Sequence, residues 1–295
     1  MYKILTKKEL APKIYSLEIE AKRVAKAALP GQFVIVRIDE KGERIPLTVA
    51  DYDVNMGTVT IVVQAVGSST NRMVELNEGD YLLDFAGPLG TPSELVHENI
   101  EDLKKMKLVF VAGGVGSAPV YPQVKWLCER GIFPDVIIGG RNKGFVLLEE
   151  EMKKLGAHIY PCTDDGSYGY KGLVTNQLKE LIESGKNYSR VIAIGPMIMM
   201  KFVALLTKEY NIPTIVSLNT LMVDGTGMCG ACRVTVGSET KFACVDGPEF
   251  DGHLVDFAEA MRRQTIYKTE EGKMLHKQEE ENEGHVCHIG AGENA

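Results

Sequence analysis

The pattern of hydrophobic residues changes near Lys104 and Lys105. Before this point, short β-rich runs alternate with glycine-containing turns, which is typical of a small barrel or sandwich. After it, short apolar runs alternate with helical patterns, which predicts a parallel sheet with helices on both faces. The expected barrel strands are 14–20, 32–38, 59–65 and 81–86. The later strands are expected at 108–112, 136–139, 191–194 and 214–218, with helices at 118–130, 147–155, 175–184 and 197–210.

Length and charge narrow the class of protein. A chain of 295 residues with 44% hydrophobic content can form two or three domains with buried cores. The 40 acidic and 33 basic residues leave no cationic excess to neutralise phosphates, which argues against nucleic-acid binding. The first residues lack the apolar core of a signal peptide, and no apolar run reaches about 18 residues. We therefore expect a cytoplasmic protein without a membrane span.

A segment rich in glycine and cysteine follows the last predicted parallel strand. Cys229, Cys232 and Cys244 have the spacing of the last three ligands of a plant-type 2Fe-2S cluster. Asp224 stands where the first cysteine of that pattern would be, and a carboxylate can also bind ferric iron. Intervening glycines let the backbone wrap closely and direct N–H groups toward the cluster sulfurs; these are Gly225, Gly227 and Gly230. The segment is too short for a core of its own and is expected to need a metal to order it.

Three alternatives to this four-ligand cluster remain open. Zinc could be bound by three cysteines and Asp224, although zinc ligands usually come as two close pairs. The thiols could be free, or a cluster could be held by the three cysteines alone. Cys128 and Cys162 fall in helix and strand patterns and are expected in the core. The histidines and the cysteine at 285–288 are expected on the surface.

Glycine-rich turns mark the ends of the predicted parallel strands. Residues 113–118 run from a strand into a helix, where free N–H groups suit a pyrophosphate. Loops 163–167 and 195–197 follow two further strands, at the edge where open α/β sheets bind ligands. Asp164 and Asp165 could bind an adenosine ribose and would repel a 2′-phosphate, which favours NAD(H) over NADP(H). Alternatively, one of them only caps the turn.

Three further segments in the β-rich region offer polar groups. Arg44, Pro46 and Thr48 supply a cation, a rigid turn and a hydroxyl, and the arginine suits a pyrophosphate. Residues 67–70 and 87–90 form two more small-residue turns. Composition alone would leave all three as ordinary loops.

Taken in order, these motifs resemble the ferredoxin-NADP reductase superfamily. Its flavin barrel has an Arg-x-[Tyr/Pro]-x-[Ser/Thr] motif and a Gly-x-x-Thr phosphate turn, and its nucleotide domain begins with Gly-Gly-x-Gly-x-[Ala/Thr]-Pro. The matching positions here are Arg44, Pro46, Thr48, Gly67, Thr70, Gly113, Gly114, Gly116, Ala118 and Pro119. The cluster segment narrows the resemblance to the branch of the dihydroorotate dehydrogenase electron-transfer subunit. Asp224 and the long tail are more similar to the small subunits of NADH-dependent reduced ferredoxin:NADP⁺ oxidoreductase and of sulfide dehydrogenase.

The resemblance implies FAD, NAD(H) and a 2Fe-2S cluster as cofactors. The residues expected at the FAD are Arg44, Pro46, Leu47, Thr48, Gln64, Gly67, Ser69, Thr70 and Gly87. Those expected at the NAD(H) are Gly113, Gly114, Gly116, Ser117, Ala118, Arg141, Asp164, Asp165, Gly195, Pro196 and Met197. Asp224, Cys229, Cys232 and Cys244 are the expected cluster ligands. Hydride transfer to the flavin needs no side-chain acid or base, so we nominate no catalytic residue and expect only that Thr48 lies near flavin N5.

The resemblance also implies a heterodimer. The partner would be a larger subunit with a second FAD and 4Fe-4S clusters, and ferredoxin would be reached through the complex. The assembly would be an electron-bifurcating transhydrogenase. The alternatives are the electron-transfer subunit of NAD-dependent dihydroorotate dehydrogenase, and a redox sensor or adaptor that has lost turnover.

These patterns predict four parts along the chain. They are an FAD-binding barrel at 1–100, an NAD-binding α/β domain at 101–218, a cluster segment at 219–253 and a tail at 254–295. From Thr269 onward the tail has seven acidic and two basic residues and no aromatic residue. We expect it to be a solvated helix or an arm that docks on the partner.

Overall fold

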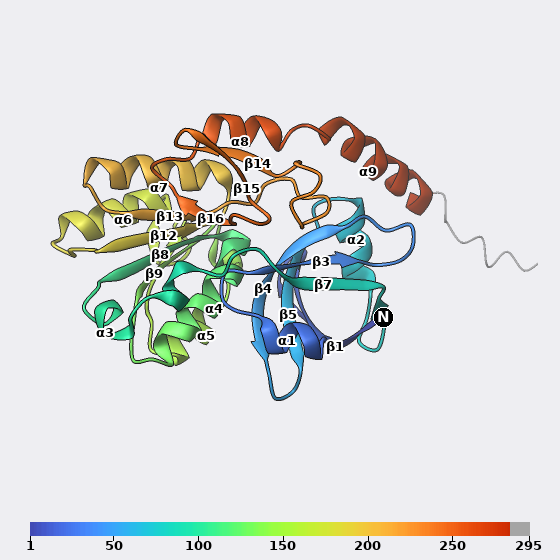
Figure 1. Cartoon of the computed structure of the whole chain (residues 1–295), viewed down its shortest axis with the longest axis horizontal. Coiled ribbons are helices and arrows are strands. Elements are labelled where there is room, and N and C mark those ends of the chain that lie inside the picture. The colour runs from blue at the N-terminus through green and yellow to red at the C-terminus, as the bar shows by residue number, and fades with distance from the viewer. Residues whose placement is uncertain (284–295) are drawn as a thin grey trace, which may run out of the picture.

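A computed structural model describes residues 1–283, with side chains described as far as residue 276. It contains a β-barrel, a parallel-sheet domain beside it, and a small segment that bridges the two (Figure 1). This is the predicted fold class. The histidines and cysteine at 285–288 lie outside the described residues.

Seven antiparallel strands form the barrel, in the order β6-β1-β2-β5-β4-β3-β7. Their apolar faces enclose a core that includes Leu17, Val34, Ile61 and Phe85. Two short helices, α1 (Lys22–Ala27) and α2 (Ser68–Glu75), belong to the same part of the chain. The strands are β1 (Tyr2–Ala11), β2 (Ile14–Glu20), β3 (Phe33–Arg37), β4 (Ile45–Asp53), β5 (Thr58–Gln64), β6 (Tyr81–Leu82) and β7 (Asp84–Leu89).

Two barrel strands were not predicted. β1 has a lysine- and glutamate-rich sequence and lies beside the two-residue strand β6, so its pairing rather than its composition makes it a strand. β4 contains the Arg-x-Pro-x-Thr motif that composition placed in a loop. Pro46 lies near the start of β4, where the strand pairs with β3 alone and its pairing with β5 has not yet begun, so one edge is free of ladder hydrogen bonds and a proline is tolerated. Likewise, residues 68–70 begin α2 and Gly87 lies within β7, so these two segments are not loops either.

The second sheet has the order β11-β10-β9-β8-β12-β13-β16. Alternating residues of its strands face opposite ways: Val109 and Val111 pack with α6 and α7, while Phe110 and Ala112 pack with α4 and α5. The strand order reverses between β8 and β12, which is where open α/β sheets bind ligands. The strands are β8 (Leu108–Gly113), β9 (Asp135–Gly140), β10 (His158–Thr163), β11 (Tyr170–Lys171), β12 (Arg190–Ile194), β13 (Thr214–Ser217) and β16 (Glu249–Asp251). The helices are α3 (Ile100–Leu103), α4 (Ser117–Cys128), α5 (Glu149–Lys154), α6 (Val174–Glu183) and α7 (Met197–Glu209).

The last strand of this sheet departs from the predicted parallel pattern. β16 comes after the cysteine segment and pairs antiparallel with β13. Between them, β14 (Arg233–Val236) and β15 (Glu239–Phe242) form a two-stranded hairpin. Its buried residues Cys232, Val234 and Cys244 join a core that also contains Phe33 and Ile35 of the barrel. The hydrophobic core of this segment is therefore completed by residues of the barrel and of the parallel-sheet domain.

Two helices end the described chain. α8 (Phe257–Arg263) packs on α7 through a core that includes Phe257 and Ala260. α9 (Lys268–Glu283) extends from it across the barrel and contacts α2 (Figure 1). Of the helices described, none is both long enough and apolar enough to cross a bilayer.

Candidate functional site

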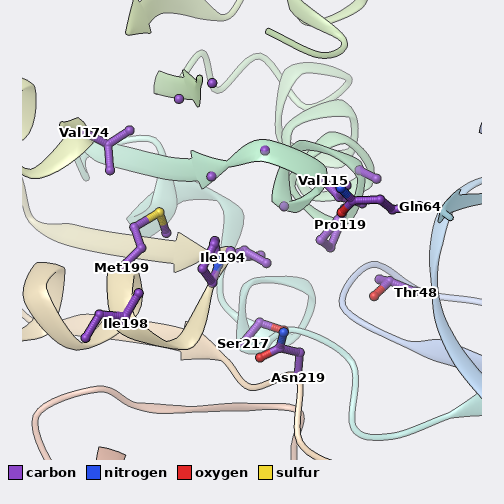
Figure 2. Close-up of a pocket in the computed structure, with 18 of the residues that line it drawn as sticks. Thr48, Gln64, Val115, Pro119, Val174, Ile194, Ile198, Met199, Ser217 and Asn219 are labelled. Atoms are coloured by element: carbon purple, nitrogen blue, oxygen red, sulfur yellow. The ribbon is translucent and has the colours of Figure 1, made fainter. Parts of the chain in front are cut away.

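A cavity of about 1020 Å³ opens between the barrel and the parallel sheet. It lies at the carboxyl ends of β8, β12 and β13, the edge to which the sequence assigned a nucleotide. Thr48 and Gln64 face it from the barrel, across from Ile194, Ser217 and Asn219 (Figure 2). The predicted site residues that line it are Pro46, Leu47, Thr48, Gln64, Gly113, Gly114, Gly116, Ala118, Arg141, Asp164, Gly195 and Pro196.

The turn after β8 can approach a ligand closely because it has almost no side chains. A Cβ at Gly116 would lie 2.1 Å from the carbonyl oxygen of Ile194, so only glycine allows the β8 and β12 turns to touch. Ser117 begins α4 and is fully buried, with a hydroxyl that has no hydrogen-bond partner in the described chain. Neither Ser117 nor the buried Met197 lines the cavity. The turn and its N–H groups are suited to a diphosphate.

The two neighbouring aspartates after β10 do different things. Asp164 lines the cavity, as does Arg141, whose guanidinium lies 5.3 Å from the ring centre of Phe145. Asp165 points into its own turn and accepts a hydrogen bond of 2.8 Å from the Ser167 N–H. Hydrogen bonds from Ser167 lower the pKa of the Asp165 carboxyl. Of the two roles weighed from the sequence, Asp165 is thus the turn cap, and Asp164 faces the cavity.

The predicted phosphate turn of the barrel lies outside this cavity. Gly67 precedes α2, and the Thr70 hydroxyl accepts hydrogen bonds of 3.0 Å from the N–H groups of Val66 and Gly67. Ser69 donates a hydrogen bond to Glu43. Gly87 packs against β3, where a Cβ would lie 2.7 Å from Val34 Cγ1. Thr70 thus caps the helix that presents this turn.

Arg44 also lies outside the cavity and contacts the cysteine segment. Its Nε donates to the carbonyl oxygen of Val223 at 3.3 Å, and its Nη2 donates to that of Asp224 at 3.2 Å. The first residue of the predicted flavin motif therefore touches the predicted cluster loop.

The structure brings together two of the four predicted cluster ligands. The Sγ atoms of Cys232 and Cys244 are buried and lie 3.3 Å apart. Cys229 is exposed on the glycine-rich loop. The Asp224 carboxylate accepts hydrogen bonds from the N–H groups of Thr226 and Cys229 and from the Thr226 hydroxyl. Within the described residues, no three histidine, cysteine or acidic side chains are gathered closely enough to hold a metal ion.

The donor chemistry of this loop nevertheless fits an iron–sulfur cluster. Two thiols are already adjacent, and the third lies on a loop whose glycines have φ values of +77°, +85° and +67° at 225, 227 and 230. Burial, with the neighbouring Cys232, raises the pKa of the Cys244 thiol above its usual range. Hydrogen bonds from Cys229 and Thr226 hold the pKa of Asp224 below its usual range, which keeps it an anion.

Several cavity residues were not predicted. Ser217 ends β13, Asn219 and Thr220 follow it, and Ile198 and Phe202 come from α7. The rule that pointed to residues 195–197, a loop at the carboxyl end of a parallel strand, applies equally to the residues after β13. The helix residues had no such signal, because an apolar side chain that lines a cavity has the same pattern as one in a core.

Comparison with protein families identifies two parts of the chain. Residues 110–204 match an oxidoreductase NAD-binding domain. Residues 219–256 match the iron-sulfur cluster binding domain of dihydroorotate dehydrogenase B.

Full-length relatives match nearly the whole chain. It is 64% identical over 283 residues to an uncharacterized protein in the adh 3′ region of Clostridium beijerinckii, covering 96% of each. It is 45% identical over 268 residues to a dihydroorotate dehydrogenase B (NAD(+)) electron transfer subunit homolog of Thermotoga maritima, covering 91% of this chain and 92% of that protein. The electron transfer subunit of Desulforamulus reducens is 31% identical over 255 residues, with 84% and 94% coverage.

Solved structures agree with these relatives. A chain from the NADH-dependent reduced ferredoxin-NADP oxidoreductase structure, a study of flavin-based electron bifurcation, is 42% identical, with a TM-score of 0.86 and coverage of 94% of this chain and 97% of that one. A ferredoxin NADP⁺ reductase from Neisseria gonorrhoeae with bound FAD and NADP shares the fold, at 17% identity, a TM-score of 0.56 and coverage of 70% and 89%.

The predicted cofactor classes, FAD, a 2Fe-2S cluster and NAD(H), agree with the two matched domains and with the ferredoxin-reductase fold, and this prediction is confirmed. The predicted superfamily and branch are confirmed as well. The chain belongs to the family of dihydroorotate dehydrogenase B electron transfer subunits, within the ferredoxin-NADP reductase superfamily.

Proposed function

We propose that this chain is the small subunit of an electron-bifurcating NADH-dependent ferredoxin:NADP⁺ oxidoreductase. It passes electrons between NAD(H), FAD and a 2Fe-2S cluster and delivers them to a larger flavoprotein subunit. The observation that carries this proposal is the 42% identity, over almost the full length of both chains, with the bifurcating oxidoreductase. Asp224, in place of the first cluster cysteine, supports the same assignment.

The lining of the cavity supports a site for each end of the nucleotide. The turn at 113–117 binds the diphosphate of NADH through its N–H groups, and Asp164 receives the adenosine ribose. The remaining length of the cavity leads to Thr48, so the nicotinamide lies against the barrel (Figure 2). When bound there, FAD would supply the exchange between the two-electron chemistry of NADH and the one-electron chemistry of a cluster. The chain's own residues bind, orient and exclude water, and none is needed as an acid or base.

The cluster loop and the tail form the surface for the larger subunit. Met228, at the tip of the loop, is 89% exposed, and Val223 and Val245 flank it with exposed side chains. We assign the partner's contact to this apolar patch and to the acidic tail beyond residue 268. The larger subunit would hold a second FAD and 4Fe-4S clusters, and ferredoxin would be reached through it. A cytoplasmic location belongs to the same proposal.

Spectroscopy of the purified chain tests the proposal. The intact, cluster-loaded protein should be yellow-brown, and NADH should bleach its flavin absorbance and then reduce the cluster without a partner. Intact protein that carries the cluster but binds no flavin would contradict the proposal. Flavin that NADH fails to bleach would instead indicate a sensor or adaptor.

A second candidate is the electron-transfer subunit of an NAD-dependent dihydroorotate dehydrogenase, which the names of the Thermotoga and Desulforamulus relatives favour. The two candidates differ in the partner. The tagged chain should co-purify with a flavoprotein that reduces NADP⁺ with NADH and reduced ferredoxin. Co-purification with a subunit that oxidises dihydroorotate would decide for the alternative.

A further inference from the structure

Arg44 joins two parts of the protein that are far apart in sequence. It stands immediately before β4 of the barrel, and its partners Val223 and Asp224 come about 180 positions later. Both contacts are to backbone carbonyl oxygens, so they hold the main chain of the loop at these two residues. In the part of the chain with described side chains, no carboxylate pairs with this exposed guanidinium.

The guanidinium has capacity for a second ligand. It is a planar fork with five N–H donors, and the two contacts use the edge formed by Nε and Nη2. The donors on the opposite edge, including both on Nη1, and the positive charge itself remain available. A planar cation of this kind suits the oxygen atoms of a diphosphate.

The loop that Arg44 holds lies directly on the barrel. Gly225 has a φ of +77°, and a Cβ there would be 2.8 Å from Ile35 Cγ1 and 3.1 Å from Leu89 Cδ1. Thr91 adds two hydrogen bonds, from its N–H to the Gly247 carbonyl at 2.7 Å and from its hydroxyl to that of Val245 at 3.0 Å. The barrel and the cluster loop are therefore in direct contact at Gly225 and Thr91 as well as through Arg44.

We propose that Arg44 is a positioning residue shared by the two cofactor sites. One edge of its guanidinium holds the carbonyls of Val223 and Asp224, and the other holds the diphosphate of FAD, so that FAD occupancy orders the cluster loop. The inference rests on the proposed function in requiring FAD on this barrel. It goes further by coupling the two sites through one side chain, and such a coupling is reciprocal.

The test is the rate at which an iron chelator removes the cluster from the full-length, cluster-loaded chain. The rate is followed by loss of the cluster's visible absorbance, with saturating FAD and after FAD has been stripped. In the wild type, FAD should slow cluster loss by roughly fivefold or more, the lower end of typical couplings. Arg44→Lys keeps a positive charge for the diphosphate but cannot bridge both ligands, so at saturating FAD it should show less than about a twofold effect.

Arg37→Lys is the matched control. Arg37 is another barrel arginine, paired through Nε with Asp84 at 2.7 Å, and within the described residues its side chain makes no hydrogen bond to the cluster loop. This variant should keep the full protection by FAD. A second measurement needs no variant: because the coupling is reciprocal, the FAD affinity of the wild-type chain should be higher with the cluster than without it.

The outcomes separate the inference from the proposed function. If FAD binds the wild type but neither protects the cluster nor binds more tightly in its presence, the coupling is overturned and the proposed function stands. Full protection in FAD-saturated Arg44→Lys would show that another contact makes the link, which also overturns it. If the wild-type chain binds no FAD, both fail.

Discussion

At the scale of single residues, two neighbouring aspartates make different contacts. Asp164 and Asp165 follow the same strand, yet one faces the cavity and the other accepts a hydrogen bond from the N–H of Ser167. The sequence could name both as candidates for the ribose. It could not choose between them, because the choice depends on which way the turn rotates each carboxylate.

The different positions of the two aspartates predict that substituting Asp164 changes the preference between NADH and NADPH. Asp164→Ser removes a negative charge from the adenosine end of the cavity, so the ratio of kcat/KM for NADPH to that for NADH should rise about tenfold, which corresponds to about 1.4 kcal/mol. Steady-state reduction of an artificial acceptor measures the ratio. Asp165→Ser is the control and should leave the ratio unchanged while it weakens the turn. Equal shifts in the two variants would mean that Asp164 does not read the ribose.

At the scale of elements, local patterns located most strands and helices. The predicted strand 14–20 coincides with β2, and the alternation after residue 108 correctly placed β8, β9, β12 and β13 with their helices. Two of the exceptions, β1 and β16, depend on distant partners. β1 is a polar sequence paired with β2 and β6, and β16 is a three-residue edge strand that β13 recruits from beyond the cysteine segment. Their strand conformation comes from hydrogen bonds that no short window of sequence contains.

Strand β16 also contains a titratable residue, Glu249, whose side chain contacts α4. The carboxylate of Glu249 accepts a hydrogen bond of 2.6 Å from Gln123 of α4, and Ser93 donates to the same glutamine at 3.2 Å. Burial raises the pKa of Glu249 from an ordinary 4.5 to about 7. The pKa of Glu249 is higher in the folded state than in the unfolded state. Its contribution to the stability of the folded protein is therefore complete below about pH 4.5 and is lost as the pH rises through 7.

Glu249→Gln should therefore flatten the pH dependence of stability. The substituted amide can still accept the hydrogen bond from Gln123 but has no charge to bury. Relative to wild type, the variant should gain stability between pH 5 and 8, by up to about 3 kcal/mol at the alkaline end. Thermal unfolding midpoints across this range measure the effect. Glu101→Gln, which removes an exposed partner of Lys104, should run parallel to the wild type, and a parallel curve for Glu249→Gln would refute the assignment.

At the scale of the whole molecule, the cluster segment depends on the barrel and the parallel sheet for its hydrophobic core. Its buried cysteines share a core with barrel residues Phe33 and Ile35, and Gly225 approaches that barrel surface closely. The expectation that so short a segment could not form its own core is consistent with this arrangement. What the sequence did not show is that the barrel and the parallel sheet supply the missing core.

A pair of glycine substitutions isolates this docking. Gly225 and Gly237 both have positive φ, +77° and +62°, so alanine at either position should cost about 1 kcal/mol of backbone strain. Only at Gly225 would the added Cβ meet another side chain, since nothing lies within 4 Å at Gly237. Gly225→Ala should thus lower the thermal midpoint further and release iron to a chelator faster than Gly237→Ala. Equal behaviour of the two variants would indicate that the loop is not tightly docked.

The sequence alone determined the order of the parts, the location of the glycine-rich turn after β8 and the cysteine spacing, because hydrophobic periodicity, turn residues and ligand spacing are properties of short stretches of chain. Only the tertiary structure decided that Asp164 rather than Asp165 faces the cavity, and that Cys232 and Cys244 lie side by side. It likewise decided that Arg44 of the barrel holds the carbonyls of Val223 and Asp224. A contact between residues about 180 positions apart arises from how two domains pack, and neither residue's local sequence encodes that packing.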